Sequence, residues 1–278
     1  MSGCEMVVKP LQREKFLTES TSSPMEHKKH SSLLNGHIFY QQFSRGYRTG
    51  IEPVLMAASI RAKPGETILE GGCGAGAALL CLAARLPNIH GIGIEKDPDT
   101  AELASYNFLQ NQHLPSAQNL SVIQAHIPHL PKSLRAIAPT PNGRFHHVMA
   151  NPPWHSPHGA LSPDHRRRLA LSTYENDPKE WVKSLTQWVL PKGSLTFIVS
   201  TAITDQVCQA LLENKCGSLE VYPFWPKQGK ESKLVLIKAI YEGRGVFKLH
   251  AGLILHKENG SFTEAADQIL RHGKALVF

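Results

Sequence analysis

The chain has 278 residues, of which 41% are hydrophobic and 19% are charged, and these values are ordinary for a globular protein with one large domain or two small ones. No apolar run approaches the roughly 18 residues of a membrane span, and the N-terminus lacks a basic-then-apolar secretory pattern. We therefore expect a cytoplasmic protein that has no membrane partner.

The five cysteines are odd in number, scattered and without a CxxC pair, which argues against a disulfide framework or a structural zinc site. His155 and His158, and likewise His126 and His129, have the spacing of metal ligands. No nearby thiol or carboxylate completes either set, so we expect a reducing compartment and no bound metal.

The formal net charge of +7 is unevenly distributed along the chain. Residues 1–50 contribute +3, residues 51–226 are neutral and residues 227–278 contribute +4. Basic ends around a neutral body suit contact with a phosphate backbone, where each neutralised phosphate adds salt-dependent affinity. A solvated basic surface without a partner would have the same charge pattern.

The N-terminal segment differs in composition from the rest of the chain. Residues 1–32 are rich in Ser, Thr, Lys and Glu and have neither helical nor strand periodicity, which predicts a disordered tail. Residues 33–278 are expected to form a single domain with a basic C-terminal extension. Within it, residues 37–50 predict a short hairpin ending in a Gly-rich turn, and residues 52–60 predict an apolar helix.

From residue 67 onwards, strand-like segments alternate with helical ones. This alternation predicts an α/β fold with a Rossmann-like, seven-stranded, mostly parallel sheet and helices on both faces. The connection between the last two strands is too short for a crossover helix, so the last strand should be antiparallel. The expected strands are 67–72, 90–96, 120–126, 146–151, 194–201, 217–225 and 233–242, and the expected helices are 77–86, 98–111, 178–190 and 203–214.

In an open parallel sheet, a ligand binds beyond the carboxyl ends of the strands, where the strand order reverses. At the first strand end, LEGGCGAG, Glu70 closes the strand and Gly72, Gly74 and Gly76 form a turn that opens a helix. Glycines let the backbone approach a ligand closely, and the helix N-terminus offers free N–H groups. A tight turn without a ligand has the same pattern.

Glu95 ends the second of these strands, twenty-three residues after Gly72. A carboxylate at this point can accept both ribose hydroxyls of a nucleoside, although an acid at a helix N-terminus is also ordinary. Together the two strand ends predict a cofactor with an adenosine part, without distinguishing NAD from S-adenosylmethionine.

The third strand end is NPPW, residues 151–154. Its two prolines remove two backbone donors, fix both φ angles near −65° and favour an extended Asn151. The result is a stiff edge with carbonyl oxygens, one amide side chain and the face of Trp154. A Pro-rich loop with a buried aromatic is the purely structural alternative.

The motifs LEGGCGAG, GIGIEKD and NPPW, in this order and spacing, resemble the class I S-adenosylmethionine-dependent methyltransferases that modify exocyclic amines. The resemblance covers residues 34–278. GYRTGIEPVLMAAS and LHKENGSFTEAADQILRHG are more closely similar to the bacterial group of tRNA (adenine-N6)-methyltransferases that act on valine tRNA. The resemblance implies S-adenosylmethionine as cofactor and an RNA substrate, most of all tRNA.

The resemblance also implies a role for the stiff edge. The Asn151 side-chain oxygen and the Pro152 carbonyl would accept the two N–H hydrogens of the target amine and so draw out its lone pair. Trp154 would stack on the target base after that base leaves its own stack.

Three further positions are expected near the cofactor. Such families usually carry an acidic residue after the third strand, where this chain has His126, so either His126 or a backbone N–H should contact the adenine. Thr49 and Gly50 would lie near the cofactor carboxylate, with a plain hairpin turn as the alternative.

Two basic segments are candidate RNA contacts. Arg166, Arg167 and Arg168 follow the NPPW loop on an expected helix, where they would contact phosphate or simply face solvent. Residues 224–233 combine aromatic side chains with lysines, and form either an RNA contact or a crossover.

Competing functions remain open at this point. Guanine-N2 methylation of ribosomal RNA uses a similar NPPFH loop, and glutamine methylation of release factors uses an NPPY loop. An adenosine-binding module without activity would be favoured if Asn151 or Trp154 were missing, and both are present. The oligomeric state is not predicted.

Overall fold

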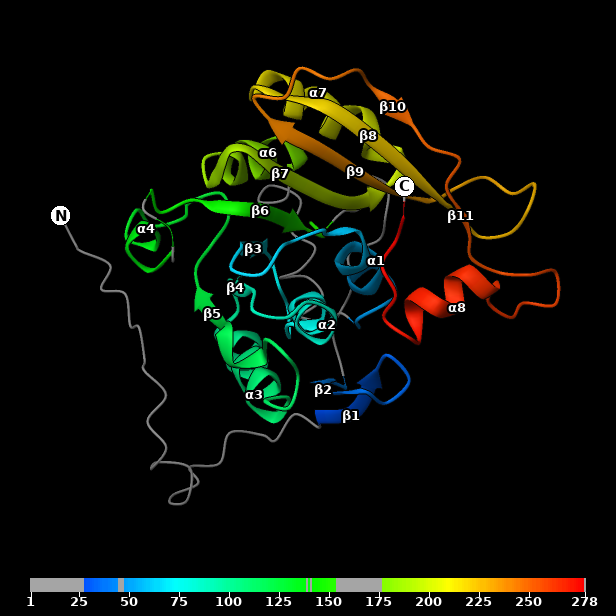
Figure 1. The fold of residues 1–278 in the computed structure, drawn as a ribbon, viewed down its shortest axis with the longest axis horizontal. Coiled ribbons are helices and arrows are strands. Elements are labelled where there is room, and N and C mark those ends of the chain that lie inside the picture. Colours follow the sequence, from blue (N-terminus) through cyan, green and yellow to red (C-terminus); the bar gives the residue numbers. More distant parts are fainter. Residues whose placement is uncertain (1–27, 45–47, 139, 141, 154–176, 278) are drawn as a thin grey trace.

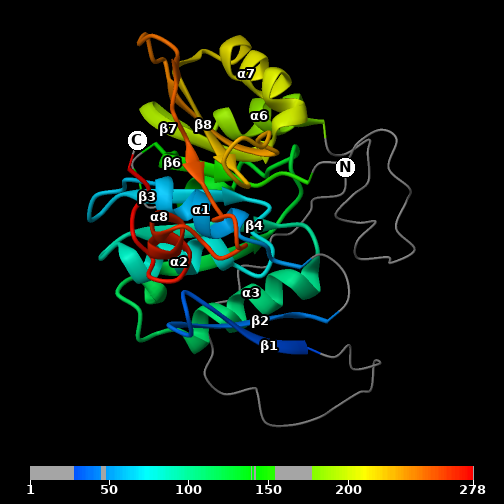
Figure 2. The ribbon, with the colours of Figure 1, turned by 90° about the vertical axis from the view of Figure 1, so that its right-hand side faces the viewer.

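A computed structural model describes residues 28–44, 48–138, 140, 142–153 and 177–277. Its centre is a twisted sheet with helices on both faces, and a separate two-stranded hairpin lies beside the helix α3, Pro98–Gln110 (Figures 1 and 2). This arrangement confirms the expected α/β class and its mostly parallel sheet.

The strand order of the sheet is β10-β8-β9-β7-β6-β3-β4-β5, with β11 also beside β8. The order reverses between β3 and β6, which are parallel neighbours. The strand β9 is antiparallel to both β7 and β8, as expected for the last long strand. The long strands are β3 Thr67–Gly71, β4 His90–Glu95, β5 Leu120–Gln124, β6 Phe145–Ala150, β7 Val189–Ser200, β8 Cys216–Trp225 and β9 Leu234–Tyr241.

The described sheet has nine strands, so the expected number of seven was too low. The two additional strands, β10 Lys248–Leu249 and β11 Leu253–Ile254, run parallel to β8. Each is only two residues long, and both residues of β10 are exposed. A strand this short shows no period-2 alternation, so the sequence gives no sign of it.

Five of the described helices lie close to their expected positions, whereas the helices Leu134–Ile137 and Glu264–Leu270 were not expected. Asp97 illustrates why α3 begins where it does, because its side chain accepts the Thr100 N–H (3.1 Å) and Pro98 occupies the first turn. The helices are α1 Glu52–Ser59, α2 Ala77–Arg85, α3 Pro98–Gln110, α4 Leu134–Ile137, α6 Pro178–Thr186, α7 Thr204–Glu213 and α8 Glu264–Leu270.

Each face of the sheet has its own hydrophobic core. The helices α1, α2, α3 and α8 contribute buried side chains to one core, and α4, α6 and α7 contribute to the other. The central strand β3 is buried along its whole length, including its two polar residues Thr67 and Glu70.

The N-terminal hairpin consists of β1 Lys28–Leu33 and β2 Ile38–Phe43. Residues 28–32 pair with β2, so the C-terminal boundary of the expected tail, residues 1–32, was placed too late in the sequence. The strand β1 is mostly polar, so the sequence lacks the alternation of apolar and polar residues that would predict a strand there. Residues 1–27 lie outside the described part of the chain, and the division into tail and domain stays a prediction.

Candidate active site

The strand register brings the three expected motifs to one edge of the sheet. Gly71, at the end of β3, pairs with Ala150 on one side and with Ile94 on the other. The glycine turn, Glu95 and Asn151 each follow directly after one of these three paired residues. They therefore meet at the carboxyl edge, at the point where the strand order reverses, which is the usual ligand site of such sheets.

The three glycines of the turn are required for different structural reasons. All three have positive φ angles, +67° at Gly72, +53° at Gly74 and +86° at Gly76. A Cβ atom at Gly76 would overlap the ring of Phe108, so this glycine allows α3 to pack closely. A Cβ atom at Gly74 would meet no atom within 4 Å, so the space beside the turn is open at that position.

Glu95 is held against the glycine turn. Its Oε2 accepts the Gly74 N–H (3.0 Å), and its Oε1 accepts the Asp97 N–H (2.9 Å). Burial raises the pKa of Glu95, while these backbone N–H groups act in the opposite direction. Each oxygen keeps a second lone pair, so the oriented carboxylate can also accept hydroxyl groups of a ligand.

Glu70 is a buried carboxylate directly beneath the turn. It is 3% exposed, and its Oε2 has no hydrogen-bond partner among the described residues. Burial raises the Glu70 pKa well above its usual range, and the charge of Glu95 adds to this shift. An unpartnered buried acceptor is costly, so this position favours a ligand with a positive or hydrogen-donating group.

Thr49 is fixed by side chains of β2. Its hydroxyl lies 2.8 Å from the Tyr40 hydroxyl, and its N–H donates to Gln42 Oε1 (3.1 Å). Burial raises the pKa of Tyr40, and the nearby Glu70 charge contributes. Thr49 is therefore hydrogen-bonded to a tyrosine that Glu70 influences, whereas contact of Thr49 and Gly50 with a cofactor carboxylate stays a prediction.

Asn107 joins three parts of the site and was missed in the sequence. From the last turn of α3, its Nδ2 donates to the Gln41 and Ala75 carbonyls (2.9 Å each), and its Oδ1 accepts the Gln41 N–H (2.9 Å). Ala75 belongs to the glycine turn, so Asn107 ties that turn to β2. Asn111, one helical turn later, binds Phe39 of β2 in the same way. Two asparagines at i and i+4 on an otherwise apolar helix face were the available signal.

The described part of the NPPW motif lies where the sequence places it. Asn151 and Pro152 follow β6 without an intervening turn; Asn151 is half-buried and Pro152 is buried. His126 follows β5 at the same edge, half-buried, with its ring 6.2 Å from that of His129. Their expected roles stay predictions. Trp154, His155, His158, Arg166, Arg167 and Arg168 lie outside the described residues.

A second concave surface lies at the carboxyl edge, beyond the end of β8. The loop after β8 and the loop after β11 project side by side (Figure 1), joined by a His256 N–H to Pro226 carbonyl bond (3.1 Å). Lys227 Nζ also donates to the Glu258 carbonyl (2.8 Å). Residues 224–233 therefore connect the antiparallel strands β8 and β9 and form one side of a two-loop surface, while their contact with RNA stays a prediction.

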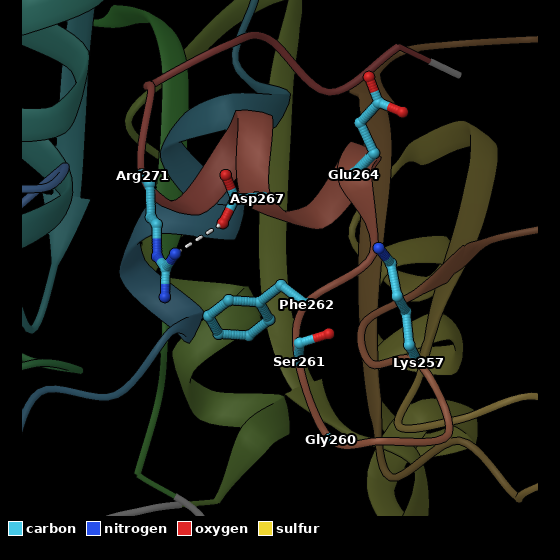
Figure 3. Close-up of a pocket in the computed structure, with 7 residues that line it drawn as sticks. All are labelled: Lys257, Gly260, Ser261, Phe262, Glu264, Asp267 and Arg271. Atoms are coloured by element: carbon cyan, nitrogen blue, oxygen red, sulfur yellow. Dashed lines mark ion pairs between the residues drawn. The ribbon is translucent and has the colours of Figure 1, made fainter.

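The pocket next to these loops has a volume of about 520 Å³ and a mixed charge. Arg271 pairs with Asp267 (3.1 Å) and lies over the ring of Phe262, while Lys257 faces them from the opposite side (Figure 3). Such a lining can contact phosphate, a base or a peptide, so it does not select a ligand by itself.

Within the described segments, no group of three or more His, Cys, Asp or Glu side chains can hold a metal ion. In the same segments, no helix has the length and apolarity needed to cross a bilayer.

The strand order and the ligand edge define a Rossmann-like methyltransferase fold. A solved structure from Agrobacterium tumefaciens, described as a predicted O-methyltransferase, superposes with a TM-score of 0.66 at 23% identity. The match covers 81% of this chain and 98% of the other, and it concerns the fold.

Curated relatives carry a more specific name, tRNA1(Val) (adenine(37)-N6)-methyltransferase. The one from Vibrio cholerae serotype O1 is 26% identical over 179 residues, covering 63% of this chain and 69% of its own. The one from Bacteroides thetaiotaomicron is 23% identical over 231 residues, covering 82% and 92%. No family model matches the chain. These relatives confirm the resemblance seen in the sequence, and the chain is a methyltransferase.

Proposed function

We propose that this protein transfers a methyl group from S-adenosylmethionine to the N6 amine of an adenine in tRNA. The observation that carries the proposal is the register that brings Asn151 and Pro152 beside the glycine turn and Glu95. The printed activity of the relatives from V. cholerae and B. thetaiotaomicron favours adenine-N6 over guanine-N2 or a glutamine amide.

The residues at the carboxyl edge fit S-adenosylmethionine better than NAD. Glu95 already accepts the Gly74 N–H, one of the amides that a pyrophosphate would need, and Glu70 adds a second carboxylate close by. Burial raises the pKa of both Glu70 and Glu95, and a ligand that carries positive charge would offset this shift, whereas a pyrophosphate would add to it. The unpartnered Glu70 Oε2 fits the cationic methionine end, and Glu95 fits the ribose hydroxyls.

The cofactor supplies an electrophilic methyl group, and the chain must supply a usable lone pair. The exocyclic amine of adenine is a poor nucleophile because its lone pair is delocalised into the ring. Acceptors at Asn151 Oδ1 and the Pro152 carbonyl would bind its two hydrogens, localise the lone pair and stabilise the developing positive charge. This role requires orientation at about 3 Å, because the amine displaces S-adenosylhomocysteine from the methyl group in line. The methylated amine is acidic enough to lose its proton to water, so no general base is needed.

We propose tRNA in the cytoplasm as the partner. The excess of positive charge at both ends of the sequence suits a phosphate backbone. Arg166, Arg167 and Arg168, together with Lys227 and Lys257 of the two-loop surface, are the proposed phosphate contacts. Trp154 is the proposed stacking face for the extruded base.

The test is methyl transfer by the purified protein with isotopically labelled S-adenosylmethionine, followed by nucleoside mass spectrometry of the RNA. Total tRNA and ribosomal RNA from a deletion strain serve as substrates, because their target positions are unmodified. We expect N6-methyladenosine in tRNA. Labelled N2-methylguanosine in ribosomal RNA, or label only in protein, would replace the proposal by one of its alternatives.

A further inference from the structure

The outer edge of the sheet carries a group of exposed apolar side chains. The strand β10 is the last strand on this side, and within the described structure no strand pairs with its free side (Figure 1). Val246, Phe247 and Leu249 are 77%, 58% and 70% exposed, and Ile254 of β11 is 36% exposed. These are four of the eight large hydrophobic side chains that are exposed among the described residues. Apolar side chains that cluster on a surface mark a contact site, whereas scattered ones need no explanation.

The backbone of this segment is held in place by β8. The Gly245 N–H donates to the Ser218 hydroxyl (2.7 Å), and the His250 N–H donates to the Val221 carbonyl (2.9 Å). Between these two bonds lies β10, which is parallel to β8. The apolar side chains therefore project from an ordered backbone, which reduces the conformational entropy that is lost when a partner binds.

Two cations flank the apolar side chains. Arg244 is exposed and has no ion pair within the described structure. The Lys248 side chain is 57% exposed, and its Nζ lies 3.6 Å from Glu220 Oε1. Glu220 Oε2 lies 3.1 Å from His250 Nε2, so this carboxylate is shared between two partners. An exposed ion pair of this kind is weak, so Lys248 can exchange it for a phosphate.

The charge of the segment favours a polyanion over a second copy of the chain. Residues 242–250 carry Arg244 and Lys248 against one acid, Glu242, and they belong to the C-terminal part of the chain with a net charge of +4. Two copies that met through this edge would bring their arginines and lysines together. A nucleic acid instead supplies a phosphate for each cation.

The apolar side chains favour unpaired nucleotides. A duplex presents its phosphates and sugars and hides the faces of its bases, whereas an unpaired base can stack on an aromatic ring. Phe247 offers such a ring, and Leu249 adds apolar surface two positions further along the chain. Duplex RNA could contact the two cations but could not cover these side chains.

The segment lies too far from Asn151 to touch the reacting base. Four strand spacings separate β10 from β6, which is roughly 19 Å across the sheet. After β10 the chain continues along β8 to its carboxyl end, where Ile254 pairs with Trp225 and the two-loop surface begins. The segment is thus continuous with the surface that carries Lys227 and Lys257.

We propose that residues 244–249 bind unpaired nucleotides of the RNA substrate outside the methyl-transfer site. Phe247 stacks on a base, and Arg244 and Lys248 contact the phosphates beside it. RNA as the natural partner rests on the proposed function, whereas the binding itself needs neither S-adenosylmethionine nor methyl transfer.

The first experiment measures the affinity of the full chain for a labelled, unstructured oligouridylate and for an RNA duplex of equal length by fluorescence anisotropy. We expect Phe247→Ala to weaken oligouridylate binding on the order of 10-fold, because a stacking face is lost, and to leave duplex binding nearly unchanged. Phe247→Trp should keep the affinity. Leu109→Ala is the matched control, since Leu109 is 44% exposed and lies on α3 near the opposite edge of the sheet (Figure 1).

The second experiment repeats the oligouridylate titration over a range of salt concentrations. Arg244→Gln should weaken binding and lower the slope of log affinity against log salt concentration by about 0.7, because one phosphate contact is lost. Lys132→Gln removes an exposed charge beside α4 and should leave the slope nearly unchanged.

Sedimentation equilibrium tests the alternative occupant, after thermal unfolding has shown that each variant is folded. If the wild type is a dimer and Phe247→Ala is a monomer with unchanged RNA affinity, the edge is an interface between copies and RNA does not bind there. Equal weakening by Phe247→Ala and Leu109→Ala, or no weakening by Phe247→Ala, also overturns the proposal. The variants at Arg244 and Phe247 should bind S-adenosylhomocysteine as the wild type does. None of these readouts uses methyl transfer, so the two proposals fail separately.

Discussion

At the scale of single residues, Asn151 is the most direct test of the methyl-transfer site. Asn151→Ala removes an acceptor that acts mainly as charge develops on the amine. We expect single-turnover methyl transfer to slow by on the order of 100-fold or more, with little change in affinity for S-adenosylhomocysteine. His155→Ala should cost less, because no general base is needed. A wild-type rate in Asn151→Ala together with an inactive histidine variant would exclude the amine clamp.

Glu70 should separate stability from cofactor binding. Glu70→Gln removes a buried carboxylate whose Oε2 has no partner in the described structure. We expect the ligand-free variant to be more stable than the wild type, and increasingly so as the pH rises, because it lacks a carboxyl group whose ionisation is disfavoured by burial. Affinity for S-adenosylmethionine should fall, because the cationic end of the cofactor loses its counter-charge. Chemical denaturation and calorimetric titration measure the two effects.

The same residue predicts a pH dependence. The Glu70 pKa is raised in the folded protein, so its protonated form is the one favoured by folding. The corresponding stability is present below the unfolded pKa and is lost as pH rises toward the folded pKa. Wild-type stability without ligand should therefore fall across this range more than that of Glu70→Gln. Equal slopes of unfolding free energy against pH would contradict a raised pKa at Glu70.

At the scale of elements, α3 organises the site through Asn107. Asn107→Ala would leave the Gln41 N–H and the Gln41 and Ala75 carbonyls without this partner in a buried place. We expect the free energy of unfolding to fall by about 2–4 kcal/mol, and cofactor affinity to fall as well, because the glycine turn loses an anchor.

Asn111→Ala provides the control, since Asn111 makes similar bonds to β2 and none to the glycine turn. Its stability should fall to a similar extent while cofactor affinity in the folded protein is kept. If both variants bind S-adenosylhomocysteine equally well, Asn107 supports the hairpin and not the turn.

The elements also show what the sequence can and cannot predict. Local periodicity and turn residues predict the long strands and five of the helices, namely α1, α2, α3, α6 and α7. They also predict the carboxyl edge, where Glu95 and Asn151 lie. The strands β1, β10 and β11 are polar or very short, and their pairing depends on neighbours distant in sequence. Asn107 was missed for the same reason, because its partners lie 66 and 32 positions away.

At the scale of the whole molecule, the two edges of one parallel sheet carry different charge. The carboxyl edge concentrates carboxylates, Glu70 and Glu95, around the place proposed for a cationic cofactor. The amino edge collects Arg61, Lys192 and Lys238 in a cavity. The loops beyond β8 and β11 add Lys227 and Lys257 to the carboxyl edge, so this edge carries both the carboxylates proposed for a cationic cofactor and lysines proposed for RNA phosphates.

The positive ends of the sequence predict a salt-dependent affinity for RNA. Each phosphate neutralised by the protein contributes about 0.9 to the slope of log affinity against log salt concentration for a duplex, and about 0.7 for a single strand. Changing Arg166, Arg167 and Arg168 together to Gln should therefore flatten the slope by about 2 to 3 if all three contact tRNA phosphates. Changing the exposed Lys132, Lys183 and Lys215 to neutral residues removes the same charge elsewhere and should leave the slope nearly unchanged. Equal flattening in both triple variants would assign the effect to net charge, and no flattening in the arginine variant would place these side chains in solvent.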